Sequence, residues 1–226
     1  MVDFGRLDNP VWSALEQRHR SIARSTGLAA RYLKDVSPFA ALREPTPKAF
    51  ADLRTLVPPG EFVGLVTADG IAIPDDWQTV AHRFIDQMVW GAAAPSAGIA
   101  LPALGDADVA DMLALTTLTE PGPVPAGTIR MGSYFGIWSS DGTLAAMAGE
   151  RMKPEGFTEI STVCTHPDHR GKGYARTLVE AAAARIFDDG RVPFLHVKTE
   201  NGAKILYEKL GFSVRAKVHF TVIALR

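Results

Sequence analysis

The sequence predicts a mixed α/β protein of the α+β class, and three observations support this. Two apolar runs, at 133–139 and 144–152, flank Asp141-Gly142, a dipeptide typical of tight hairpin turns. A third strand-like run, 157–165, leads through a glycine-containing turn into an alanine-rich segment with apolar residues at helical spacing. Strand-like and helix-like runs then alternate to the end of the sequence.

The N-terminal region carries weaker signals. Asn9-Pro10 is typical of a helix start. We expect a second, less regular helix at 28–33 and a strand at 62–67 between turn residues. Partial alternation of apolar side chains favours another strand at 77–90.

The segment 91–102 is rich in alanine, glycine and proline, and we place a domain boundary there, with an accessory region at 1–92 and a second domain at 93–226. The elements expected in the second domain are a helix at 106–118, the hairpin, the strand 157–165, a helix from about Gly171 to Phe187, a strand at 193–198, a helix at 202–210 and a strand-rich tail at 212–225.

Composition narrows the class of protein. The 226 residues are 46% hydrophobic and carry a formal net charge of -1, which is ordinary for a globular protein and indicates no nucleic-acid partner. A single cysteine excludes an internal disulfide framework. The sequence shows neither a secretory signal nor the run of about 18 apolar residues that a membrane helix needs. We therefore expect a cytoplasmic protein without a membrane partner; no feature indicates an oligomeric state.

The turn after the strand 157–165 invites several interpretations. Cys164, His166 and His169 lie close together, but zinc needs three or four convergent ligands, and Pro167 ends the strand, so we expect no metal. Cys164 is a weak candidate for a nucleophile, because its nearest histidine lies in the turn. A dinucleotide site is also disfavoured, because the glycine pattern lacks its third glycine.

A phosphate site fits this turn best. Arg170-Gly171-Lys172-Gly173-Tyr174-Ala175 lies between a strand end and a helix start, where free backbone N–H groups and the helix dipole attract anions. The charge is uneven: 13 basic residues stand against 8 acidic ones from Arg151 onward, and 11 against 17 before it. A local basic field adds to this attraction, so we expect a pyrophosphate here.

The turn resembles the acyl-CoA-binding motif of the GNAT superfamily of N-acetyltransferases, Gln/Arg-x-x-Gly-x-Gly/Ala, which Arg170, Gly173 and Ala175 match. The later run ENGAKILYEKLGF resembles the family's second conserved block, with matches at Asn201, Tyr207 and Gly211-Phe212. The resemblance covers about residues 96–226 and implies a mostly antiparallel sheet flanked by helices, with acetyl-CoA as co-substrate. Because some members carry a degenerate copy of the fold, it suggests such a copy in residues 1–92.

The resemblance also implies catalytic roles. Tyr207 would be the general acid that protonates the departing thiolate, and Glu159 would be the general base. Alternation along the strand would place Glu159 on one face with Ser161, Val163 and Thr165. Because an ordinary glutamate is a weak base for an amine, burial would have to raise its pKa, or water would have to relay the proton. His166, His196 and Glu150 stay open as alternative bases.

Cofactor contacts follow from the same resemblance. The backbone of Val163 and Thr165 would bind the pantetheine arm, and Asn201 would contact that arm or cap the helix that carries Tyr207. The full predicted set of cofactor-binding residues is Val163, Cys164, Thr165, Arg170, Gly171, Lys172, Gly173, Tyr174, Ala175 and Asn201.

The sequence thus predicts an enzyme that acetylates a primary amine from acetyl-CoA. Two alternatives stay open: a non-catalytic acyl-CoA-binding sensor, and an enzyme that uses a longer acyl chain. The acidic excess before residue 150 suggests a cationic acceptor such as a polyamine, aminoglycoside or lysine side chain, although a solvated surface explains it equally well.

Overall fold

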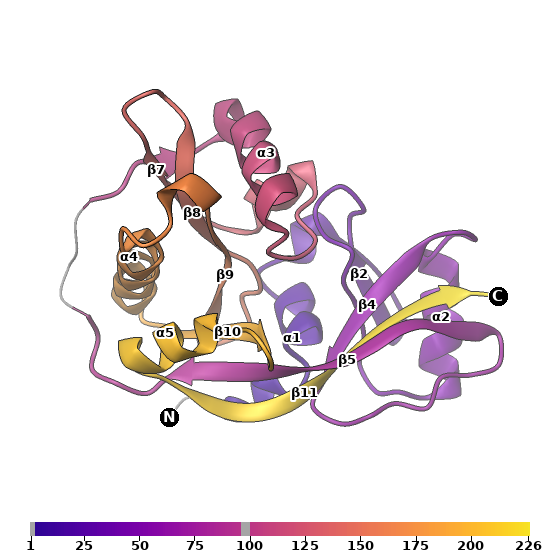
Figure 1. Ribbon diagram of the computed structural model, residues 1–226. Coiled ribbons are helices and arrows are strands. Elements are labelled where there is room, and N and C mark those ends of the chain that lie inside the picture. Colours follow the sequence, from indigo (N-terminus) through magenta and orange to yellow (C-terminus); the bar gives the residue numbers. More distant parts are fainter. Residues whose placement is uncertain (1–2, 96–99) are drawn as a thin grey trace.

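The computed structural model describes residues 3–95 and 100–226; residues 96–99, inside the expected domain boundary, lie outside the described residues. Eight strands form one large sheet in the order β4-β11-β5-β10-β9-β8-β7-β6, and three short strands form a second sheet, β1-β2-β3 (Figure 1). The strands are β1 (Ala23–Thr26), β2 (Ala29–Tyr32), β3 (Ala40–Leu42), β4 (Phe62–Thr67), β5 (Trp77–Trp90), β6 (Ala103–Leu104), β7 (Tyr134–Trp138), β8 (Leu144–Glu150), β9 (Phe157–Thr165), β10 (Val192–Lys198) and β11 (Phe212–Leu225).

Five α-helices accompany the sheets in the described ranges: α1 (Pro10–Glu16), α2 (Pro47–Leu56), α3 (Val109–Thr119), α4 (Tyr174–Asp188) and α5 (Ala203–Leu210). Short 3-10 turns at η1 (Phe4–Leu7), η2 (Arg20–Ile22), η3 (Asp106–Asp108), η4 (Ala126–Met131) and η5 (Pro167–His169) connect them. None of the helices in these ranges combines the length and the apolar character needed to cross a membrane.

The large sheet is antiparallel except between β9 and β10. These two strands run parallel and pair at only three positions, Phe157–Glu159 against Val192–Phe194. Parallel neighbours need a crossover connection, which α4 provides. Beyond Glu159 the two strands separate, and this separation positions the site described below.

The sheet continues across the predicted boundary between residues 92 and 93. β4 and β5 come from the N-terminal part, yet β4 pairs with β11, and β5 pairs with both β10 and β11. β5 and β11 are the longest strands and stay paired over nearly their whole length (Figure 1). The suggested degenerate copy of the fold in residues 1–92 stays a prediction.

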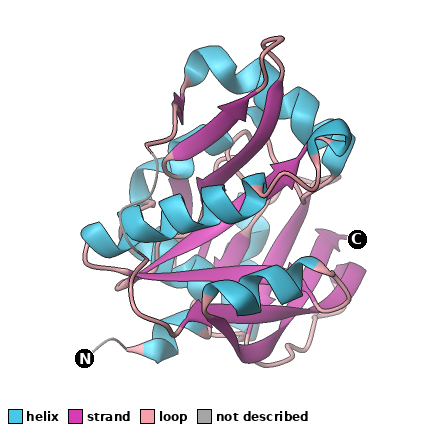
Figure 2. Cartoon of the chain, turned by 60° about the vertical axis from the view of Figure 1, so that its left-hand side comes forward, coloured by secondary structure: helices cyan, strands magenta, loops and turns pink. Residues whose placement is uncertain are grey.

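Helices cover both faces of the sheet. On β8, Met147 packs with Met112 and Leu115 of α3, whereas its neighbours Ala146 and Ala148 pack with α4. Successive strand residues point to opposite faces, so α3 and α4 lie on opposite sides. α5 lies on the α4 side, where these two helices come forward in Figure 2.

Most predicted elements of the C-terminal part are confirmed within a few residues, as are the strands at 62–67 and 77–90. The predicted helix at 28–33 was wrong, since β2 occupies Ala29–Tyr32. β2 is the middle strand of the small sheet and is buried throughout, so it shows no alternation, and tertiary pairing decides its state. No prediction covered α2, which Thr46 caps by accepting from the Ala49 backbone N–H.

Candidate functional site

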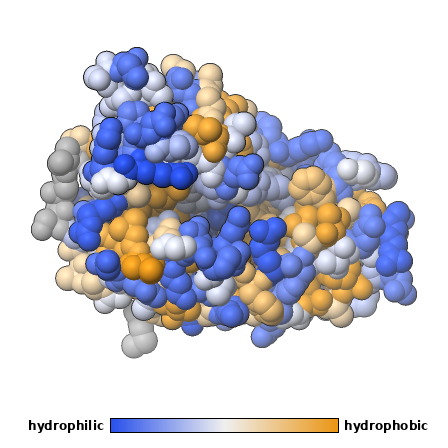
Figure 3. Space-filling view, in the orientation of Figure 1, coloured by the Kyte–Doolittle hydropathy of each residue, from blue (hydrophilic) through white to orange (hydrophobic). Residues whose placement is uncertain are grey.

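A cavity of about 910 Å³ opens where β9 and β10 separate. The turn before α4, the first half of α5, the loop after α3 and parts of β4, β5 and β11 all contribute to its wall. In the space-filling view this face is hollowed near its middle, between α3 above and β5 below (Figure 3). The predicted cofactor-binding residues all line this one cavity.

The turn before α4 has the geometry of an anion site. Gly171 and Gly173 have φ values of +77° and +81°, a region that favours glycine, and a Cβ on either would meet nothing within 4 Å. α4 begins at Tyr174, and no side chain caps its free backbone N–H groups. Arg170 and Lys172 are exposed beside them, so the turn offers backbone donors, space and positive charge together.

The edge of β9 continues this site. Past Glu159 the strand has no ladder partner on its β10 side, and Val163, Cys164 and Thr165 line the cavity. An extended ligand can hydrogen-bond such an open strand edge. The Cys164 side chain packs in the apolar cluster beneath α3, where burial raises the pKa of its thiol to about 11. At neutral pH this thiol stays protonated, which disfavours a nucleophilic role.

A β-bulge in β9 changes which side chains share a face. Ser161 lies opposite Gly149, but Cys164 lies opposite Met147, so one extra residue is inserted. Thr162 takes the inserted position with φ +55°, a strained value for a β-branched residue. The expected common face was therefore wrong. Glu159 and Ser161 stay on the α3 side, while Val163 and Thr165 turn toward α4.

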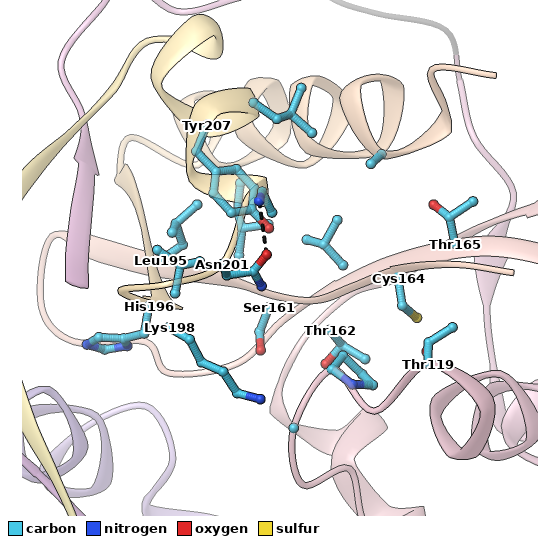
Figure 4. A pocket seen from close by; sticks show the side chains of 18 of the residues that line it. Thr119, Ser161, Thr162, Cys164, Thr165, Leu195, His196, Lys198, Asn201 and Tyr207 are labelled. Atoms are coloured by element: carbon cyan, nitrogen blue, oxygen red, sulfur yellow. Dashed lines mark hydrogen bonds between the residues drawn. The ribbon is translucent and has the colours of Figure 1, made fainter. Parts of the chain in front are cut away.

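Asn201 lies just before α5 and Tyr207 lies within this helix, and both side chains line the cavity (Figure 4). The Asn201 side chain accepts a hydrogen bond of 2.9 Å from the Ala203 backbone N–H, so it holds the first turn of the helix. The Tyr207 ring packs against Phe212 and lines the cavity. Burial is the main cause that raises the pKa of the Tyr207 phenol to about 12, and the neighbouring Cys164 adds to this effect. The phenol therefore keeps its proton at neutral pH.

Glu159 does not occupy the position of a general base. It is fully buried, is absent from the cavity wall, and forms two hydrogen bonds with the Arg151 guanidinium at 2.9 and 2.7 Å. His196 Nδ1 at 2.8 Å and the Met152 backbone N–H at 3.2 Å complete its shell. Burial alone would raise its pKa, but Arg151 and then His196 hold that pKa far below the ordinary range. This geometry argues against the role that we predicted for Glu159.

Hydrogen bonds also assign the tautomer of His196. The Gln87 side-chain amide donates through Nε2 to the Leu7 carbonyl at 2.8 Å, while its oxygen accepts from Arg215 at 2.9 Å. The same Nε2 lies 3.1 Å from His196 Nε2, which must therefore accept. The proton on Nδ1 is then directed to Glu159, so both ring nitrogens are hydrogen-bonded within the protein and neither is free to take a proton from a substrate.

His196 is part of the cavity wall, but the two remaining base candidates, Glu150 and His166, lie outside it. Glu150 is buried and bound to Lys153 at 2.7 Å, and His166 caps the turn η5 by accepting from the Asp168 backbone N–H. Among the described residues that line the cavity, the only carboxylate is Glu120, which is exposed at the end of α3. In the same part of the chain no group of three or more potential ligands is placed to hold a metal ion.

The structure adds cavity residues that the sequence analysis did not find. They come from the N-terminal part, from β5, β10 and β11, and from the residue after β8, and all lie outside the two motifs: Phe39, Val66, Arg83, Ile85, Arg151, Lys198 and Phe220. No local pattern marks them, because only the pairing of distant strands brings them together. The partial alternation at 77–90, which predicted a strand there, bears on Arg83 and Ile85.

Comparisons with known proteins agree with this geometry. The family described as FR47-like protein matches residues 134–221. A crystal structure from Novosphingobium aromaticivorans DSM 12444, assigned as an acetyltransferase of the GNAT family, is 36% identical and superposes with a TM-score of 0.89, covering 97% of this chain and 98% of that one. No curated protein matches the sequence.

Two more distant structures share the fold. A GCN5-related N-acetyltransferase from Kribbella flavida has a TM-score of 0.66 at 19% identity, over 92% of this chain and 93% of its own. A GNAT-family acetyltransferase from Colwellia psychrerythraea has a TM-score of 0.52 at 12% identity, over 66% of this chain and 58% of its own.

Proposed function

The chain belongs to the GNAT family of acetyltransferases, and from that premise we propose that it transfers an acetyl group from acetyl-CoA to an amine. One observation carries the proposal. β9 and β10 part after three residue pairs, and the gap joins an open strand edge to a glycine turn at the start of α4. An extended ligand with a pyrophosphate at one end matches that sequence of features.

The residues present fit acetyl-CoA. The space at Gly171 and Gly173 and the free N–H groups of α4 suit a pyrophosphate, with Arg170 and Lys172 beside it. The β9 edge offers backbone hydrogen bonds to the amide groups of a pantetheine arm, which Val163 and Thr165 would supply. Acetyl-CoA supplies a thioester: the amine nitrogen bonds to its carbonyl carbon, the C–S bond breaks, and the amine proton lost to solvent is matched by one gained at sulfur.

Tyr207 is the group that we propose for protonating the departing sulfur. A phenol with a pKa of about 12 is a weak acid against an ordinary thiol, whose pKa is about 8.5. Burial in the cavity would disfavour a free thiolate and so raise the pKa of the departing thiol, which favours proton transfer from the Tyr207 hydroxyl.

The first experiment tests cofactor binding by calorimetry with CoA. Gly173→Ala should weaken binding, because a side chain would enter the phosphate space. Gly142→Ala is the matched control: Gly142 has a φ of +85°, also meets nothing within 4 Å, and lies in the hairpin between β7 and β8. Both variants carry the same backbone strain, so only the first should lose affinity. Equal CoA affinity in the two variants, or no binding by the wild type, would contradict the proposal.

The second experiment tests Tyr207→Phe in single-turnover acetylation of an amine. The ring packing on Phe212 is kept, so unfolding temperature and CoA affinity should be unchanged. Loss of a general acid should lower the rate by about 10²–10⁴. A loss of about five- to tenfold would mean that the hydroxyl only hydrogen-bonds to the thioester. An unchanged rate would remove Tyr207 from the reaction, and CoA binding without turnover of any amine would favour a sensor.

A further inference from the structure

The cavity extends beyond the gap onto the face of the sheet. Val66 of β4 lies directly opposite Phe220 of β11, and Phe220 lies opposite Arg83 of β5. Directly opposed residues project from the same face, so these three side chains form one row. All three line the cavity.

A second row lies beside the first. Ile85 is two residues from Arg83 and therefore on the same face, and it lies opposite Lys198 of β10. Phe39 packs edge-on against Phe220, with ring centroids 5.9 Å apart. We call the five residues of the two rows, together with Phe39 beside them, the distal subsite: Phe39, Val66, Arg83, Ile85, Lys198 and Phe220.

The distal subsite is separate from the phosphate turn. In the sheet order, β4, β11, β5 and β10 lie on one side of the gap, and the turn follows β9 on the other. A ligand that fills the turn and the gap therefore leaves the distal subsite for a second molecule. That second molecule is the acceptor under the proposed function, on which this inference rests.

The chemistry of the distal subsite is apolar and cationic. Phe39 and Val66 are buried, while Ile85 and Phe220 are half-buried, so together they form an apolar floor. Lys198, which extends into the cavity in Figure 4, and Arg83 are exposed at its border. Within the described ranges, neither of these two cations belongs to an ion pair or a side-chain hydrogen bond.

The neighbouring charges do not offset these two cations. Arg151 lies 5.1 Å from the Phe39 ring centroid, but Glu159 already balances its charge. Glu120 is exposed at the end of α3 and is the only carboxylate among the described residues of the cavity wall. The subsite therefore carries a positive potential over an apolar floor.

We propose that the distal subsite binds an amine acceptor that also carries a carboxylate and an apolar group, the chemistry of an apolar amino acid. The carboxylate pairs with Arg83 and Lys198, and the side chain rests on Phe220 and Ile85. A polyamine, which the acidic excess of the N-terminal part suggested, would stand beside two uncompensated cations. With the acceptor bound, two cations face one carboxylate, and the remaining positive charge lowers the pKa of the ammonium group and favours the neutral amine.

Acetylation kinetics on three acceptors test the proposal: L-phenylalanine, phenethylamine, which lacks the carboxylate, and spermidine. The wild type should prefer L-phenylalanine by kcat/KM. In Arg83→Met and Lys198→Met, the preference for L-phenylalanine over phenethylamine should fall about 10- to 100-fold, the effect of one charge-assisted hydrogen bond. Lys217→Met is the matched control, because Lys217 lies opposite Asp86, on the other face of the same sheet.

Calorimetry gives a readout independent of turnover. N-acetyl-L-phenylalanine, the product, should bind the CoA-saturated wild type and bind Arg83→Met about 10- to 100-fold more weakly. CoA affinity should be equal in both proteins.

Three results would overturn the inference while leaving the proposed function intact: preference for spermidine, an unchanged preference in both variants, or loss of CoA affinity in Arg83→Met. Wild-type protein that binds no CoA would refute the proposed function instead. Calorimetric titration with N-acetyl-L-phenylalanine alone would then test the distal subsite. Binding would support the proposed subsite, and no binding would overturn it.

Discussion

Replacing Glu159 with glutamine separates a structural role from a catalytic one. The Glu159 carboxylate takes two hydrogen bonds from Arg151, one from His196 Nδ1 and one from the Met152 backbone N–H. A glutamine of the same shape turns one acceptor oxygen into an NH₂ group. That group then faces a donor of Arg151 or of His196, since the Gln87 amide fixes the His196 tautomer.

The expected cost follows from burial. Glu159 is fully buried, and the Arg151 side chain is only 16% exposed, so Arg151 would keep a buried charge without its partner. Breaking a buried ion pair from one side costs about 3–5 kcal/mol. For a chain of this size the unfolding temperature should fall on the order of 10 °C. The double variant Glu159→Leu with Arg151→Met should recover much of this loss, because no unpaired charge remains.

Denaturant and thermal unfolding at neutral pH would measure the cost. Because the folded pKa of Glu159 lies below its unfolded value of 4.5, its stabilisation is complete above that pH and is lost as the pH falls further. The folded fraction of the Glu159→Gln protein should keep the rise of the acetylation rate with pH, because that rise reports the deprotonation of another group. A Glu159→Gln protein that unfolds like the wild type but no longer gains rate as the pH rises would contradict this prediction, since Glu159 would then be the general base.

Three further predictions concern other buried groups. His19 donates to the Met131 carbonyl and accepts from Tyr32, and burial lowers its pKa to about 4. In the unfolded chain His19 binds a proton more readily, so the free energy of unfolding should fall by about 3 kcal/mol between pH 6.5 and 4. In urea titrations, His19→Gln should make the free energy of unfolding less dependent on pH over this range. An equal pH dependence in the two proteins would contradict the assignment. Cys164→Ala should keep turnover within about tenfold, because the thiol stays protonated; abolished activity would restore the nucleophile interpretation. Gly149→Ala should lower the free energy of unfolding by about 1–3 kcal/mol, since its Cβ would lie 2.2 Å from the Tyr134 ring, and an unchanged melting curve would contradict this.

The sequence by itself was sufficient for the elements around the phosphate turn. Local chemistry determines them: glycines that allow positive φ, a helix start with free N–H groups, an Asp-Gly hairpin turn and an asparagine that accepts from the first backbone N–H of α5. Such signals depend on residues close together in the sequence, so a pattern can reveal them. The glycine turn before α4 and the position of Tyr207 on the cavity wall belong to this group.

Tertiary structure decided what depends on strand register and on distant partners. The inserted Thr162 moves Val163 and Thr165 to the other face, and a shift of one residue leaves no mark in an alternating sequence. Glu159 changed from a candidate base to a buried ion-pair partner because β8 brings Arg151 and β10 brings His196 to it. The distal subsite exists only because β4 and β5 pair with strands that lie more than a hundred residues away in the sequence, and no local pattern encodes that pairing.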